Sequence, residues 1–202
     1  RALRDNDMPA PTQIIAVGKA ASAMARAASV KYPKAPILIV TKDGHSTGAP
    51  RGAVVIEAAH PVPNTASLKG GGAIAEAVAQ ASPNAHILML VSGGASALAE
   101  VLQPDLSLAD LMTATTDKLA SGADIHAINA MRRDLSQIKG GKLIAGFQGR
   151  RVTTLAISDV EGDDLNVIGS GIGMVHAPQE FTFEAQIVAA NRIARTAIAE
   201  RA

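Results

Sequence analysis

The hydrophobic residues of this chain gather in short runs that are continuous rather than alternating with polar residues. Runs of this kind, rich in Ile, Val and Leu, are typical of strands that are buried on both faces of a parallel sheet. The runs cover residues 14–17, 37–41, 54–56, 87–91 and 152–157. We therefore expect these segments to form the strands of one sheet.

Ala-rich stretches with the hydrophobic spacing of helices lie between and after these runs. We expect helices over residues 20–31, 66–81, 107–119 and 182–202. Ser107 is placed to cap the third of them, and the last sets apolar residues such as Phe183 and Ile187 along one face. Strands that alternate with helices predict an α/β domain, with a mostly parallel sheet and helices on both faces.

The composition excludes several classes of protein. The chain has 202 residues, 48% hydrophobic and only 2% aromatic, which is enough for one domain with an aliphatic core. The absence of cysteine excludes disulfides, Cys-ligated zinc, iron–sulfur clusters and thiol catalysis. A formal charge of +1 provides no basic field for nucleic acid. Since no apolar run approaches the ~20 residues of a membrane helix and the first residues lack a signal-peptide core, we expect a cytoplasmic protein that contacts no membrane.

Polar residues and glycines follow three of the predicted strands, at the point where each strand ends. They are Gly18 with Lys19, residues 92–96 (SGGAS), and Asp159 with Asp163 and Asp164. The carboxyl ends of parallel strands meet at one edge of the sheet, which is where open α/β sheets bind ligands. Glycine turns, a lysine and aspartates at that edge fit a phosphorylated ligand with a divalent cation.

The two glycine turns match no fully specific signature. Lys19 lacks the upstream glycine and the following hydroxyl of a Walker A loop, so it either reaches a phosphate or carboxylate or is a surface lysine after a tight turn. Gly93 and Gly94 either expose amides that form an anion nest or only form a strand-to-helix corner. Because the Gly-x-Ser-x-Gly signature is not met, we do not interpret Ser92 or Ser96 as a hydrolase nucleophile.

The remaining polar candidates also have two interpretations each. Capping of turns or helices accounts for at least one of the three aspartates, and Asp159 is the one that we favour as a metal ligand or catalytic carboxylate. Arg132 and Lys139 lie in a basic segment around a second diglycine, and they either bind an anion or belong to a solvated helix face. A lone histidine such as His60 is more often a turn residue than a catalyst.

Eight segments in this order resemble the type II glycerate kinases (glycerate 2-kinase, MOFRL family), which are often labelled hydroxypyruvate reductases. Each segment alone would be a weak signal, whereas the ordered series identifies the family. The segments are GKAASAMA at 18–25, TKDGH at 41–45, AHPVP at 59–63, SGGASAL at 92–98, SGADI at 121–125, INAMR at 128–132, SQIKGG at 136–141 and SDVEGDD at 158–164.

The resemblance implies ATP-dependent, Mg²⁺-assisted phosphorylation of D-glycerate to 2-phosphoglycerate. It also implies a large Rossmann-like domain followed by a smaller α/β domain, with the active site in the cleft between them. Lys19, Arg132 and Asp159 would be catalytic, and Asp159, Asp163 and Asp164 would hold Mg²⁺. The residues that would contact substrate and phosphate are Gly18, Ser92, Gly93, Gly94, Ser96, His60, Asn129 and Lys139.

The chain departs from the family pattern after the aspartate segment. Ser170 and Gly171 are followed by Ile172 and Gly173 rather than by Pro-Thr, and the interval to the expected last helix is short. We therefore interpret residues 1–202 as a single Rossmann-like N-terminal domain. It belongs either to a naturally shortened relative or to a longer two-domain protein whose second domain is absent here.

Two other functions stay open. One is an NAD(P)H-dependent hydroxypyruvate reductase, although no predicted strand is followed by the Gly-x-Gly-x-x-Gly turn of a dinucleotide site. The other is a non-catalytic module that binds an organic anion or a nucleotide. A homodimer also stays open, because Ala-rich helix faces can pack on the sheet or on a second subunit.

Overall fold

The computed structural model describes residues 8–176 and 179–190. In chain order its elements are β1 Gln13–Val17, α2 Ala21–Lys31, β2 Ile37–Lys42, β3 Val54–Ala58, α3 Thr65–Ala79, β4 His86–Val91, α4 Ala95–Leu98, α5 Leu108–Ala120, α6 Ile125–Leu135, α7 Lys142–Ala145, β5 Arg151–Ser158, the 3₁₀ turns η1 Glu161–Asp163 and η2 Ile168–Gly171, and β6 Thr182–Ala190.

The strands form one sheet in the order β3-β2-β1-β4-β5-β6, and every neighbouring pair is parallel. The five continuous apolar runs of the sequence are β1 to β5, so the predicted parallel sheet is confirmed. The reason is visible in β1, where Ile14 and Ile15 point to opposite faces and are both fully buried. A strand that is covered on both sides has no polar face to alternate with.

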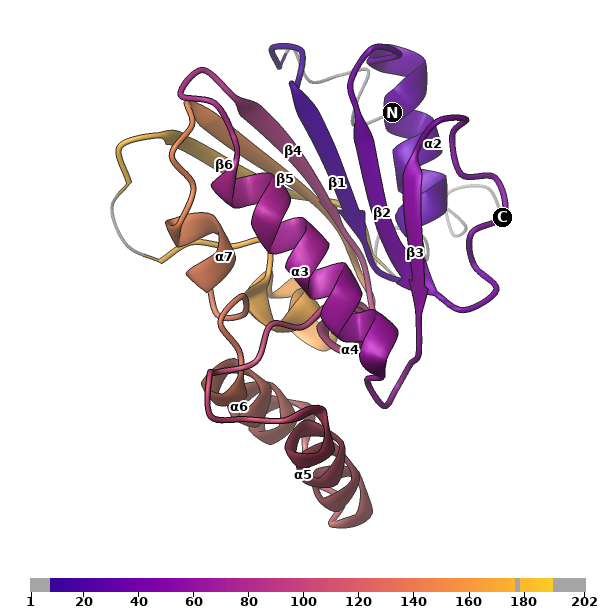
Figure 1. Cartoon of the computed structure of the whole chain (residues 1–202), viewed down its shortest axis with the longest axis vertical. Helices are drawn as coiled ribbons and strands as arrows, with labels where there is room; N and C mark the ends of the chain where they lie inside the picture. The colour runs from indigo at the N-terminus through magenta and orange to yellow at the C-terminus, as the bar shows by residue number, and fades with distance from the viewer. Residues whose placement is uncertain (1–7, 177–178, 191–202) are drawn as a thin grey trace.

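Helices cover both faces of the sheet (Figure 1), as predicted. On one face, α3, α4 and α7 pack over a core that includes Ile74, Leu98 and Ile144. On the other face, α2 packs its small side chains on β1 and β2. α3 and α5 each begin at a capping box, and the predicted cap Ser107 accepts a hydrogen bond from the Asp110 amide at 3.2 Å.

The predicted helix over residues 182–202 is wrong for its first part, because residues 182–190 form the edge strand β6. Along this strand, Thr182, Glu184 and Gln186 are exposed, whereas the residues between them are partly buried. In an edge strand with one solvent-exposed face, polar and apolar residues alternate instead of forming a continuous apolar run. The apolar residues of such a strand can be mistaken for the apolar stripe of a helix. The rest of the predicted helix lies outside the described residues.

Helices α5 and α6 form an antiparallel hairpin that projects away from the sheet (Figure 1). α5 packs on α6, and α6 in turn contacts η2 at the carboxyl edge of the sheet. The basic segment that the sequence left open as anion binder or solvated face is therefore split. Its first half lies in α6, and its second half returns to the body of the domain.

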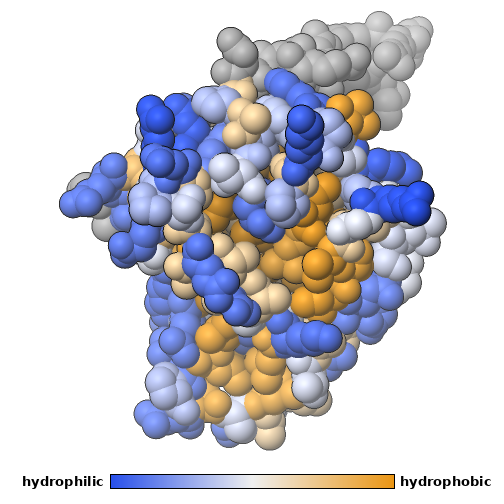
Figure 2. Space-filling view, turned by 45° about the horizontal axis from the view of Figure 1, so that its top comes forward, coloured by the Kyte–Doolittle hydropathy of each residue, from blue (hydrophilic) through white to orange (hydrophobic). Residues whose placement is uncertain are grey.

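The surface keeps some apolar area. Figure 2 shows apolar side chains gathered on one face between charged ones. Large hydrophobic side chains that are exposed include Val30, Val54, Met112 and Leu119. A homodimer stays a prediction. Among the described residues, no helix is both long and apolar enough to cross a membrane.

Candidate active site

The turns that end β1 and β4 are joined by three hydrogen bonds. The Lys19 amide donates to the Gly93 carbonyl at 2.9 Å, and the Ala20 amide donates to the Ser92 hydroxyl at 3.1 Å. The Ser92 amide donates to the Val17 carbonyl at 3.0 Å. Gly18 has a φ of +124°, and a side chain there would overlap Ser92. Gly18 and Ser92 thus hold the two turns together, because close approach of the backbones requires glycine.

The diglycine loop, residues 92–96, exposes backbone without side chains beneath Asp159, His60 and Lys19. A Cβ on Gly93 would overlap the carboxylate of Asp159. A Cβ on Gly94, which has the left-handed φ of +86°, would lie 3.1 Å from the His60 ring and 3.2 Å from Cγ of Lys19. The loop therefore brings Asp159, His60 and Lys19 within contact of one stretch of backbone, and only glycines leave the room for them.

Lys19 and Asp159 face each other at the carboxyl ends of β1 and β5. The Lys19 Nζ lies 3.5 Å from the Asp159 Oδ2, and the two side chains remain 41% and 47% exposed. An ion pair this open to water contributes little to stability. Both side chains are exposed enough to be accessible to a ligand.

Arg132 reaches the same edge from α6 and is only 7% exposed. Its Nη1 donates to the Ser96 hydroxyl at 2.6 Å, and its Nη2 donates to the Pro61 carbonyl at 3.4 Å. Its Nε is buried with no hydrogen-bond partner. Burial lowers the pKa of the Arg132 guanidinium, and the nearby Glu100 opposes that shift. A guanidinium stays charged in proteins, so this side chain is a cation with an unused donor.

His60 is surrounded by these charges. Burial lowers its pKa below the ordinary 6.5, the positive charges of Lys19, Arg132 and Lys42 lower the pKa further, and Asp159 opposes them. Burial and these positive charges therefore favour the neutral form of the His60 ring. Lys42 at the end of β2 is a cation of the site that the sequence analysis did not single out. The signal for it in the sequence was its place in the TKDGH segment at 41–45, at the end of a predicted strand.

Two predicted contact residues are used inside the protein instead. The Asn129 side chain is buried, accepts from the Ser170 hydroxyl at 2.7 Å and donates to the Val167 carbonyl at 3.4 Å. Lys139 is fully buried in an ion pair with Glu100, and burial lowers its pKa to about 8. This arrangement differs from the predicted anion contact, because the ammonium of Lys139 already faces a carboxylate and no solvent reaches it.

The three aspartates after β5 do not act as one cluster. Asp164 Oδ1 accepts from the backbone and side-chain nitrogens of Asn166 at 2.8 and 2.9 Å, which is turn capping. Asp163 has a left-handed φ of 53°. Within residues 8–176 and 179–190, no group of three or more acidic, histidine or cysteine side chains is close enough to hold a metal. Asp159 is the aspartate that faces Lys19.

The charges around His60 predict how the stability of the protein depends on pH and how a bound anion shifts the pKa of this histidine. Because the folded pKa lies below 6.5, the unfolded chain binds this proton first on acidification. The stability due to His60 is thus complete above pH 6.5 and is lost as the pH falls through the folded pKa. Inorganic phosphate bound beside Lys19 and Arg132 would offset their charges and raise the pKa of His60.

NMR titration of the histidine ring protons, with and without phosphate, measures this shift. His86 is the control, because its pKa is lowered mainly by burial and its ring hydrogen-bonds Thr153 at the opposite end of the sheet. An unchanged His60 titration at saturating phosphate would show that no anion binds near this ring.

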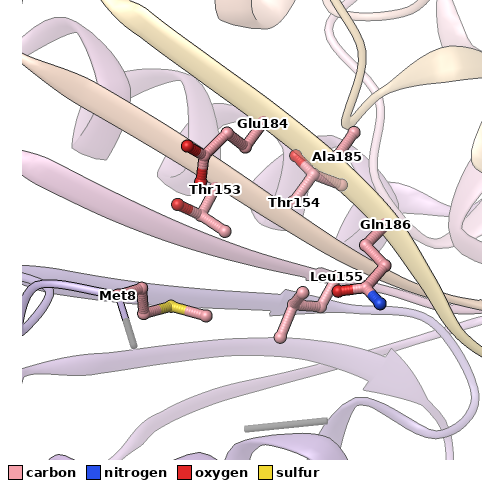
Figure 3. Close-up of a pocket in the computed structure, with 7 residues that line it drawn as sticks. All are labelled: Met8, Thr153, Thr154, Leu155, Glu184, Ala185 and Gln186. Carbon is pink, nitrogen blue, oxygen red and sulfur yellow. The ribbon is translucent and has the colours of Figure 1, made fainter. Parts of the chain in front are cut away.

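A separate cavity of about 280 Å³ lies along β5 and β6 (Figure 3). It contains none of the predicted site residues. The Thr153 hydroxyl bonds to His86, the Thr154 hydroxyl donates to the Gly173 carbonyl at 2.7 Å, and Glu184 pairs with Arg151 at 3.0 Å. These three lining groups already have partners within the protein.

The sheet order and the position of this edge define the class of protein. It is a Rossmann-like α/β domain, and cationic side chains lie over a glycine turn at the carboxyl ends of its strands β1, β4 and β5. The chain belongs to the family described as "Domain of unknown function (DUF4147)", whose model matches residues 3–201.

Known relatives of this chain carry glycerate kinase names. A D-glycerate 2-kinase of Thermotoga maritima is 41% identical over 162 residues, which cover 78% of this chain and 38% of the relative. A glycerate 2-kinase of Pyrococcus horikoshii is 42% identical over 158 residues, covering 78% and 36%. The crystal structure of a glycerate kinase from Thermotoga maritima superposes with a TM-score of 0.81 at 32% identity, covering 93% of this chain and 53% of that one.

These comparisons confirm the family resemblance and the fold that the sequence predicted. They also show that the chain spans less than two fifths of the length of these two curated relatives. The activity of the full-length relatives is therefore only a proposal for this chain.

Proposed function

We propose that this chain provides the catalytic edge of a glycerate 2-kinase. Such an enzyme transfers the γ-phosphoryl group of ATP to the 2-hydroxyl of D-glycerate. The observation that carries the proposal is the meeting of Lys19, Asp159 and the buried cation Arg132 over the diglycine loop. The names of the relatives support the same reaction.

The residues at this edge fit a phosphate or carboxylate. The Gly93 and Gly94 backbone leaves a floor that a side chain would fill, and the Arg132 Nε is a buried donor without a partner. Lys19, Lys42 and Arg132 outnumber the single carboxylate of Asp159 around His60. An anionic ligand would balance these charges, and a guanidinium beside an ammonium suits phosphoryl oxygens.

Phosphoryl transfer requires positioning and charge neutralisation more than covalent catalysis. In the proposed step, Lys19 and Arg132 hold oxygens of the transferring group or of the glycerate carboxylate. Asp159 accepts the proton of the attacking 2-hydroxyl. That oxygen bonds to the γ-phosphorus while the bond to the β-γ bridging oxygen breaks, and ADP leaves. His60, whose neutral form is favoured, packs over Gly94 beside Lys19 and adds no charge to the site.

A divalent cation also fits the chemistry of the edge. Mg²⁺ takes one or two carboxylates together with phosphate oxygens, so Asp159, which lies at the diglycine loop, would hold it beside the phosphates. When bound, it would neutralise the charge that develops on the phosphoryl oxygens. The prediction that all three aspartates are ligands stays untested.

The strand order favours one alternative, because β3-β2-β1-β4-β5-β6 is also the order of dinucleotide-binding domains. Relatives from Agrobacterium vitis, 40% and 38% identical, have names that include hydroxypyruvate reductase. The turn after β1, however, reads Val17-Gly18-Lys19-Ala20 and lacks the glycine spacing of a pyrophosphate turn. A non-catalytic module that binds an organic anion is the third candidate.

Two parallel assays of the 202-residue chain separate these functions. We expect ADP release that depends on D-glycerate and Mg²⁺, and no NADH consumption with hydroxypyruvate. NADH consumption would overturn the proposal in favour of the reductase. Binding of ATP by calorimetry with neither activity would support the binding module. A cytoplasmic location stays a prediction.

A further inference from the structure

The α5–α6 hairpin is attached to the domain through two neighbouring chain segments at its base. The segment that enters the hairpin and the segment that leaves it pair through an antiparallel bridge between Leu102 and Ser136. The Gln103 amide donates to the Leu135 carbonyl at 3.0 Å, and the Gln137 amide donates to the Val101 carbonyl at 2.7 Å. The orientation of the hairpin therefore depends on what holds these two segments together.

A buried ion pair lies between the two segments. Glu100 and Lys139 are both 0% exposed, and the Lys139 ammonium donates to the Glu100 carboxylate. The same carboxylate accepts from the Ser136 hydroxyl and, at 3.0 Å, from the Val101 amide. Taking two charges out of water costs free energy that a hydrophobic pair would not, so such a pair is weak evidence for stability alone.

Glu100 is also anchored to the body of the domain. Its amide donates to the Ser67 carbonyl in α3 at 3.0 Å. The backbone of α3 approaches Glu100 so closely that a Cβ on Gly71 would overlap it. The carboxylate is thus presented by a rigid part of the fold, and Ser136 and Lys139 of the hairpin base bind to it.

The ion pair follows closely, in the chain, on the two helices that carry Ser96 and Arg132: Glu100 comes just after α4, and Lys139 comes just after α6. Ser96 of α4 lies four residues before Glu100, and Arg132 of α6 lies four residues before Ser136. Arg132 donates to Ser96 at 2.6 Å, while Ser136 donates to Glu100. Two parallel connections therefore join these segments, one in the site and one directly behind it.

We propose that Glu100 and Lys139 are positioning residues, which latch the base of the α5–α6 hairpin and so hold Arg132 against the diglycine loop. The proposal depends on the proposed function only in that Arg132 then binds an anion. Without the latch, the hairpin leans away from the sheet and the guanidinium of Arg132 becomes accessible to solvent.

The test uses phenylglyoxal, which modifies accessible guanidinium groups, with the extent of modification at Arg132 read by peptide mass spectrometry. In Lys139→Met of the 202-residue chain, we expect the modification rate of Arg132 to rise about tenfold, because local opening exposes a buried group. Protection of Arg132 by inorganic phosphate should weaken in the same variant.

Two controls separate positioning from general destabilisation. Arg151→Met removes an ion pair at the edge of the sheet, and Ile39→Val weakens the core on the α2 face. Both should leave the Arg132 modification rate within about twofold of the parent. Should Lys139→Met fail to fold, the double variant Glu100→Gln/Lys139→Met removes both charges and should still expose Arg132.

A folded latch variant in which Arg132 stays as unreactive as in the parent would overturn the proposal. The measurement needs neither ATP nor glycerate. An unchanged modification rate of Arg132 would therefore overturn only this proposal, whereas the absence of kinase activity would overturn only the proposed function.

Discussion

Replacing Lys19 with methionine is expected to lower kcat/KM for glycerate phosphorylation by about 10²–10³-fold, the loss typical of removing one charge-stabilising group. The ammonium of Lys19 lies at the diglycine loop, 3.5 Å from Asp159 and open to solvent. Methionine keeps most of the aliphatic volume and removes the charge. Coupled ADP release with D-glycerate measures the change.

Lys34→Met is the matched control for this substitution. Lys34 is exposed in the loop before β2, at the end of the sheet away from the site, and its loss should leave kcat/KM within about twofold. Circular dichroism of both variants checks that the fold is retained. A Lys19→Met protein that turns over at a near-normal rate would contradict the central role given to this lysine.

The largest effect on stability is expected from Gly71→Ala in α3. A Cβ at this position would overlap backbone atoms of Glu100, which cannot move aside as a flexible side chain can. We expect the free energy of unfolding to fall by about 2–3 kcal/mol, the size of an overpacking defect. Urea unfolding followed by circular dichroism gives this value.

The neighbouring Gly72 provides an internal control, because a Cβ there meets nothing within 4 Å. Gly72→Ala should raise the free energy of unfolding by about 0.5–1 kcal/mol, since alanine loses less backbone entropy in a helix. The two adjacent substitutions are therefore expected to have opposite signs. Equal effects would mean that the contact between α3 and Glu100 does not decide the result.

Much of the sheet could be predicted because burial on both faces leaves a mark in the sequence. β1, β2, β4 and β5 each read as a continuous apolar run, and the short edge strand β3 also read as apolar. β6 escaped prediction because it packs on β5 alone and keeps one wet face. Its period of two was hidden by apolar residues that also fit a helical stripe.

The position of Lys19, the diglycine loop and Asp159 could be predicted for a topological reason. All three follow strands that are parallel, and the ends of parallel strands meet at one edge. The local sequence is therefore enough to predict that these groups lie close together. His60 and Lys42 follow β3 and β2 in the same way. A single histidine or lysine after a strand carries too little signal by itself, so His60 was predicted as a contact only through the family resemblance and Lys42 was not predicted.

The basic segment around residues 129–143 shows where sequence alone stops. The sequence by itself determined that Arg132 and Lys139 are cations close to a glycine turn. Only the tertiary structure decided that Arg132 points to the site and Lys139 points inward. The partner of Lys139 is Glu100, and the partners of Arg132 are Ser96 and the Pro61 carbonyl. All three are distant in sequence from the basic segment and come close to it only in the folded chain. A charge can be buried only where an opposite charge or hydrogen-bond partners compensate for the loss of water. Such a place exists only in the folded chain.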